Sequence, residues 1–304
     1  MTVLRLASAS EGRAILAAED DFTRALGGFD RSFRMRTVAR VDDSELRRFL
    51  GEQPVDFTAD EAAAWEEAIT AVAHGVRGMS GVLPPEVLVV KTTGREERDH
   101  AYTRANAIVL PATRVRHLRG ERAIRLLAHE LFHVATRTSR ALRDATYALL
   151  GFASIASGSI LPPPELDDRR MTNPDAHTLA HFIRLEGRAF VPLLTCPLPL
   201  AEVLERTSVL GVVRPTLLEI DPDAGTALRD ASGAPILVDP RETEWAQRLA
   251  RNTTYTIHPE EVLAENLALL VRRRLGATEL PADPAFLAAF EEALVADAHF
   301  PLAP

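Results

Sequence analysis

The segment from Glu121 to Arg137 contains the pattern His-Glu-x-x-His. On an α-helix, side chains four residues apart project from the same face, so His129 and His133 could direct two imidazoles at one metal ion. Glu130 lies about 100° further round the helix, beside such an ion, where metal-assisted hydrolysis needs a base. Any fold of this chain therefore has to bring a further ligand and a substrate surface to this helix.

The residues around the motif predict a buried helix. Apolar residues 126–128 precede the motif, and Leu131 and Phe132 separate the two histidines. Two histidines and a glutamate on a mostly buried helix are costly unless something satisfies them. The surroundings therefore favour a metal site over the alternative, two surface histidines on an ordinary helix. Zinc is the metal expected for two imidazoles and a carboxylate with a fourth position open to water.

The third ligand has to lie outside this helix. A His-x-x-Gly-x-x-His continuation would need glycine at 136 and histidine at 139, where the chain has Thr136 and Ser139. A later helix is predicted over 259–275, because Pro259 suits a first turn and Gly276 an end.

Two glutamates four residues apart share one face of this later helix. We assign Glu261 to the metal and Glu265 to a hydrogen bond that orients a ligand histidine, and we expect Glu260 to point elsewhere. The alternative is an acidic first turn stabilised by the helix dipole, which would explain Glu260 and also Glu261. Other candidates for the third ligand are Glu265, His177, His181 and Asp175.

His-Glu-Leu-Phe-His on one helix, with Glu-Val-Leu-Ala-Glu-Asn on a later one, resembles the gluzincin metallopeptidases. A strand predicted over 102–110, just before the motif helix, also resembles the zincin edge strand, along which an extended peptide pairs by β-augmentation. The resemblance covers about 102–138 and 255–275. The gap between the motif and Glu261 is long for a gluzincin, and Glu265 stands where aspartate is common.

The resemblance implies a zinc-dependent metallopeptidase acting on a peptide or protein substrate, with Glu130 as general base. Tyr255 and His258, just before the Glu261 helix, are the nearest candidates for stabilising the oxyanion; Tyr147 and His181 are others. Each of these could equally be structural. Arg104 and Asn106 on the predicted edge strand would either contact the substrate or face solvent.

Two other functions remain open from the sequence. The chain could be a catalytically silent metal-binding or interaction protein with a zincin fold. It could also be a zinc hydrolase of a non-peptide amide. The metal acts only on the carbonyl of the scissile bond, and the pocket selects the remainder of the substrate. Glu130 favours an enzyme, since a purely structural zinc site has no use for it.

The predicted fold is α+β and zincin-like: mostly helical, with an antiparallel or mixed sheet whose edge strand precedes the motif helix, and a small β-rich insertion. Residues 1–156 carry the edge strand and the motif. Residues 157–240 form the insertion, opening with a proline-rich loop over 157–176 that is a candidate lid. Residues 241–304 form a helical region with the third ligand, and the three parts are expected to make one compact catalytic unit.

Composition limits the remaining possibilities. The net charge of −8 disfavours a nucleic-acid partner. Cys196 is the single cysteine, which rules out an intramolecular disulfide and a cysteine-based metal site. We find neither an apolar run of 18 residues nor a signal-peptide pattern, so the expectation is a soluble cytoplasmic protein with no membrane partner.

Overall fold

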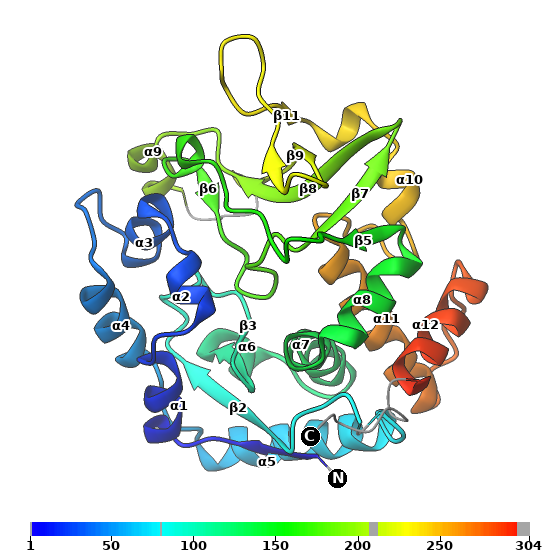
Figure 1. Ribbon diagram of the computed structural model, residues 1–304. Coiled ribbons are helices and arrows are strands. Elements are labelled where there is room, and N and C mark those ends of the chain that lie inside the picture. Colours follow the sequence, from blue (N-terminus) through cyan, green and yellow to red (C-terminus); the bar gives the residue numbers. More distant parts are fainter. Residues whose placement is uncertain (1, 80, 207–211, 297–304) are drawn as a thin grey trace, which may run out of the picture.

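The computed structural model describes residues 2–79, 81–206 and 212–296. Within these residues the chain forms twelve α-helices and two β-sheets, which confirms the mixed α+β class (Figure 1). The helices are α1 (Ala9–Leu16), α2 (Asp21–Ala25), α3 (Gly28–Met35), α4 (Asp43–Gly51), α5 (Ala59–Gly75), α6 (Ala112–His117), α7 (Glu121–Thr138), α8 (Arg140–Leu149), α9 (Leu200–Leu204), α10 (Trp245–Leu249), α11 (Pro259–Arg274) and α12 (Pro284–Ala296). Two short 3-10 turns cover Pro164–Leu166 and Pro240–Glu242.

The first sheet has four strands in the order β1-β2-β4-β3. They are β1 (Val3–Leu6), β2 (Glu86–Thr92), β4 (Ala107–Pro111) and β3 (Tyr102–Arg104). The first three run parallel, and β3 pairs antiparallel with β4 at the end of the order. All residues of β4 and all but the first of β2 are buried, as is expected for strands that are covered on both faces.

The single strand predicted over 102–110 is wrong, because the chain turns back on itself there. β3 ends at Arg104, Ala105 and Asn106 form a turn, and β4 starts at Ala107. Ala105 adopts a left-handed backbone with φ of 48°, a conformation that sequence signals such as Asn-Gly usually announce. The edge strand is therefore the short β3, which still precedes α7 in the chain.

The second sheet is antiparallel and built round a meander of β7 (His181–Leu185), β8 (Arg188–Thr195) and β9 (Arg214–Asp221). The β7–β8 hairpin closes on Glu186 and Gly187, both with positive φ, as a two-residue turn between twisted strands requires. Short strands complete it: β5 (Phe152–Ser154), β6 (Arg170–Met171), β10 (Thr226–Ala227) and β11 (Leu237–Val238). The predicted insertion is thus β-rich, although β5 precedes residue 157.

The largest hydrophobic cluster joins all three parts of the chain. It contains Trp65 of α5, Phe132 of α7, Phe190 of β8 and Leu263 of α11. Helix α7 lies near the centre of the molecule, with the second sheet above it and α5 below in Figure 1. In the part of the chain that is described, no helix combines the length and apolar character needed to cross a membrane.

Candidate metal centre

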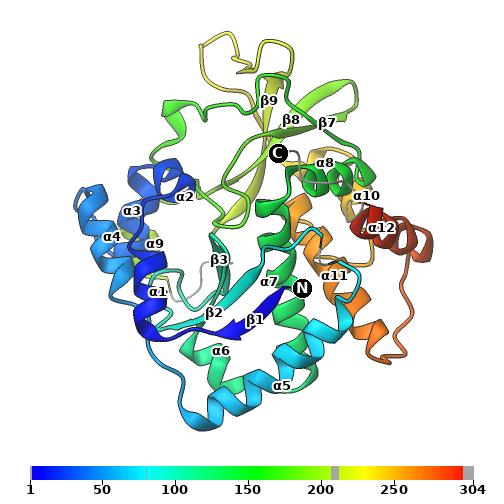
Figure 2. The same ribbon diagram turned by 60° about the horizontal axis from the view of Figure 1, so that its bottom comes forward.

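Helix α7 carries both motif histidines and packs beside α11, as Figures 1 and 2 show. Leu127 and Leu131 of α7 belong to the same buried cluster as Val262 and Leu263 of α11. The face of α7 that carries the two histidines meets α11, because both rings lie within hydrogen-bonding distance of its glutamates. His133 and Glu261 are therefore neighbours in space although they are 128 positions apart in the sequence.

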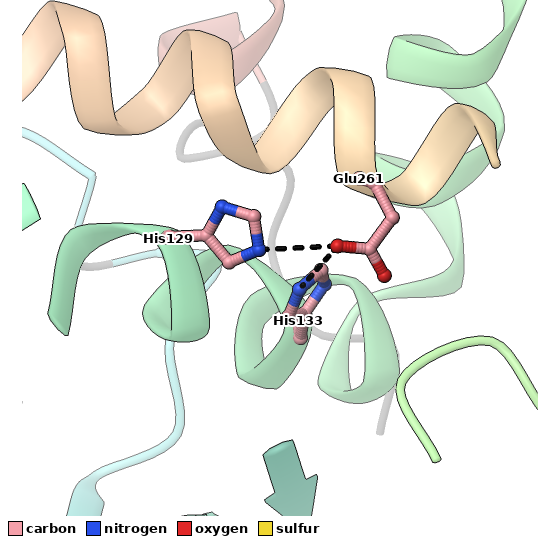
Figure 3. Close-up of side chains that lie close together, drawn as sticks. All are labelled: His129, His133 and Glu261. Atoms are coloured by element: carbon pink, nitrogen blue, oxygen red, sulfur yellow. Dashed lines mark hydrogen bonds and ion pairs between the residues drawn. The ribbon is translucent and has the colours of Figure 1, made fainter. Parts of the chain in front are cut away.

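The two histidines and Glu261 converge on one point (Figure 3). Nε2 of His129 lies 3.1 Å from Oε2 of Glu261, and Nε2 of His133 lies 3.8 Å from the same oxygen. Tetrahedral ligands at about 2.0–2.2 Å from zinc stand roughly 3.3–3.6 Å apart, which falls between the two distances. The three side chains could therefore hold a metal ion.

Glu265 lies where it can orient the first histidine. Its Oε1 is 3.0 Å from Nδ1 of His129, and Arg125 donates to its other oxygen at 2.5 Å. The imidazole is thereby held with Nε2 directed at Glu261. A carboxylate on the far nitrogen of a ligand histidine is the usual way in which proteins fix such a ring.

Glu260 does not point elsewhere, as the sequence led us to expect. Its Oε1 lies 3.2 Å from Nδ1 of His133 and accepts from the Thr136 hydroxyl at 2.5 Å, while Tyr147 donates to Oε2 at 2.8 Å. The first turns of α11 are buried on nearly every side, so an acid at this position has no route to solvent. The apolar residues around Pro259-Glu260-Glu261 were the signal that could have revealed this.

Each histidine thus has one ring nitrogen on a glutamate behind it and the other facing Glu261. Although burial alone would lower it, hydrogen bonds to Glu261 and Glu265 raise the pKa of His129 well above its ordinary value. Burial would raise the pKa of Glu261, but His129, His133 and Asn173 hold it far below the usual range. Glu261 is therefore held as a carboxylate that faces both histidines.

Glu130 is buried beside this group, with 3% of its surface exposed. Its Oε2 has no hydrogen-bond partner among the described residues. Burial, followed by the charge of Asp175, raises the pKa of Glu130 to about 8. A buried acid with an oxygen that has no partner is costly, and a nearby cation with its water would relieve that cost and favour the carboxylate form. This chemistry fits a metal ion held by His129, His133 and Glu261.

A cavity of about 570 Å³ opens on the group. Its walls include His129, Glu130, Glu261 and Tyr255, together with the segment Thr172–Asp175. Tyr255 is 37% exposed, and burial, with Glu261 next, raises the pKa of its phenol. The hydroxyl therefore stays protonated, and it is the predicted oxyanion donor that lines this cavity.

Comparison of the chain with family models, with curated proteins and with solved structures found no match. The gluzincin resemblance consequently rests on the motif, the position of Glu261 and the geometry of the site.

The other predicted donors have structural partners. His258 caps α11, with Nδ1 accepting from the Glu260 N–H at 3.1 Å, and burial lowers its pKa to about 4. It lines a smaller neighbouring cavity. His181 lies 2.6 Å from Asp144 through Nε2, and Tyr147 is engaged by Glu260.

The structure does not bring Arg104 and Asn106 to the metal group. Arg104 is 1% exposed and donates from Nε to Asp20 at 2.7 Å, while the Asn106 amide donates to the Glu86 carbonyl at 2.9 Å. Within the described part of the chain, the residues lining the main cavity include neither of them. Both side chains serve the N-terminal sheet and its covering helices.

Proposed function

We propose that this protein is a zinc-dependent metallopeptidase with a zincin-like arrangement of motif helix, ligand helix and edge strand. The observation that carries the proposal is the convergence of His129 and His133 on Oε2 of Glu261, with Glu130 buried beside them. A site that only held a structural ion would need neither this glutamate nor an open cavity.

The chain's own groups supply the steps of peptide hydrolysis. Bound zinc would polarise the scissile carbonyl and make the attacking water more acidic. Glu130 accepts a proton from that water as the new C–O bond forms, and then delivers it to the leaving nitrogen as the C–N bond breaks. The Tyr255 hydroxyl, protonated and facing the cavity, is the donor available to the developing oxyanion.

The first prediction is that the purified protein contains about one zinc per chain and hydrolyses peptides from a mixed-sequence library. Glu130→Gln should retain the zinc, because Glu130 is not a ligand, and should lower kcat by at least about 100-fold, because the proton acceptor is lost. Elemental analysis and mass spectrometry of the digested library provide the two measurements.

Glu67→Gln on the exposed face of α5 is the matched control and should keep both zinc and activity. A protein that contains no divalent metal after expression in zinc-supplemented medium would refute the metal site. Full activity in Glu130→Gln would show that Glu130 is not the base, and would not contradict the metal site.

A further inference from the structure

The segment Thr172–Asp175 runs from β6 toward β3 and lines the cavity of the metal group. Its start is firmly attached to the protein. The backbone N–H and the hydroxyl of Thr172 donate to the Asp30 carboxylate at 2.8 and 2.7 Å, and Arg34 donates to the Thr172 carbonyl at 3.1 Å. Asp30 and Arg34 form a fully buried ion pair at 3.0 Å. Buried hydrogen bonds therefore hold this end of the segment in the cavity wall.

Its other end covers the edge strand. The backbone N–H and the hydroxyl of Thr103, the middle residue of β3, donate to Oδ1 of Asp175 at 2.8 and 2.5 Å. Arg137 holds this arrangement by donating to the Thr103 hydroxyl at 2.7 Å and to the Pro174 carbonyl at 3.1 Å. An extended peptide added to β3 would need that same N–H for one of its carbonyls. Asp175 therefore occupies a hydrogen-bonding position of an added strand.

The segment also contacts the metal group. The Asn173 amide donates to Oε1 of Glu261 at 2.9 Å. One carboxylate oxygen of Asp175 and one ligand atom each of Glu130 and His133 lie within 4.8 Å of one another. Only 8% of the Asp175 side chain is exposed. Asp175 thus lies between the edge strand and the proposed base, where the substrate backbone would have to pass.

We propose that Thr172–Asp175 is an autoinhibitory strap, and that an extended peptide has to displace Asp175 from Thr103 before it can align with the metal. The inference rests on the proposed peptidase function and adds a control step to it. The structure corresponds to the closed state. In the open state, Thr103 pairs with the substrate backbone, and Arg137 no longer holds the strap.

The test compares two zinc-binding probes on the zinc-loaded protein. Acetohydroxamate is small and needs no edge strand, whereas a tripeptide hydroxamate needs one. Asp175→Ala should raise the affinity for the tripeptide hydroxamate by about tenfold or more, because two hydrogen bonds no longer have to be displaced. The affinity for acetohydroxamate reports any change that the variant makes at the metal group itself, so the ratio of the tripeptide affinity to the acetohydroxamate affinity should rise by about tenfold or more. Asp168→Ala, at a residue in the same connection whose side chain is 72% exposed, is the matched control and should change neither affinity.

Hydrogen exchange on the wild-type protein gives a second readout that does not depend on a variant folding. Binding of the tripeptide hydroxamate should speed exchange in 172–176 while the N–H of Thr103, bonded to the peptide instead of Asp175, stays protected. Unchanged or weaker tripeptide affinity in Asp175→Ala, or greater protection of 172–176 on binding, would overturn the strap. If the strap fails these tests but the wild type takes up zinc and binds acetohydroxamate, the proposed function survives. If the wild type takes up no zinc, the proposed function and the strap both fail.

Discussion

Three polar groups lie within hydrogen-bonding distance of the Glu260 carboxylate: the ring of His133 and the hydroxyls of Thr136 and Tyr147. Its side chain is 1% exposed, so water cannot replace any of these partners. Burying such a charge is stabilising only when its partners stay in place. The residue therefore fixes the ring of His133 in the same way that Glu265 fixes that of His129.

We predict that Glu260→Gln lowers the zinc affinity about 10–100-fold, because the amide removes the charge that favours the bound imidazole and leaves its own N–H₂ facing donors. Competition with a chromogenic chelator measures the effect. Glu279→Gln, at a carboxylate that is 56% exposed, should bind zinc like the wild type. Equal affinities in Glu260→Gln and the wild type would make Glu260 a packing residue only.

Helices α7 and α11 form the element that zinc would cross-link. A ligand that binds only the folded state stabilises it by about 4 kcal/mol at a thousandfold excess over its Kd. We predict that zinc raises the melting temperature by roughly 5–10 °C and that chelation reverses this. Glu261→Gln should abolish the zinc-dependent rise, whereas Glu292→Gln on the exposed face of α12 should retain it. A rise of equal size in Glu261→Gln would move the third ligand elsewhere.

The sequence predicted those parts of the site that depend on helix geometry. His129 and His133 share a face because they are four residues apart, and Glu261 could be found from its spacing to Glu265. The role of Glu260 could not be read this way, because an acidic first turn also fits an exposed helix. Its contacts depend on how deeply α11 is buried.

Other features depend on contacts between distant parts of the chain. The hairpin at Ala105 carries no strong turn signal, so the sequence pattern predicted a single strand over 102–110. The bond from Thr103 to Asp175 joins residues 72 positions apart, which no local pattern records. The proline-rich connection over 157–176 was predicted to be a candidate lid. The part of it that lines the cavity is bonded to Asp30 and Arg34, which are far away in the sequence.

The stability of the whole molecule is linked to pH through His258, which caps α11 as a neutral imidazole. Because Nδ1 of His258 accepts the N–H of Glu260 at the start of α11, protonation on Nδ1 would break the cap. Burial lowers the pKa of His258 to about 4 from an ordinary value of 6.5. Between these two values the unfolded chain binds a proton that the folded protein does not, so the free energy of unfolding falls as the pH drops from about 6.5 to about 4.

We therefore predict that His258→Asn, which keeps an acceptor at the cap, makes this acid-induced loss shallower. In that interval, the slopes of the free energy of unfolding against pH should differ between the variant and the wild type by up to one proton, or about 1.4 kcal/mol per pH unit. Above about pH 7 the two slopes should be equal. Urea unfolding of the chelator-treated protein at pH 7.5, 6, 5 and 4.5 measures it without interference from metal release. His74→Asn, at an exposed position on α5, should follow the wild-type curve. The helix that His258 caps also carries the proposed ligand Glu261. Parallel curves for His258→Asn and the wild type would mean that acid unfolds the protein from another region, and that the start of α11 does not limit its stability.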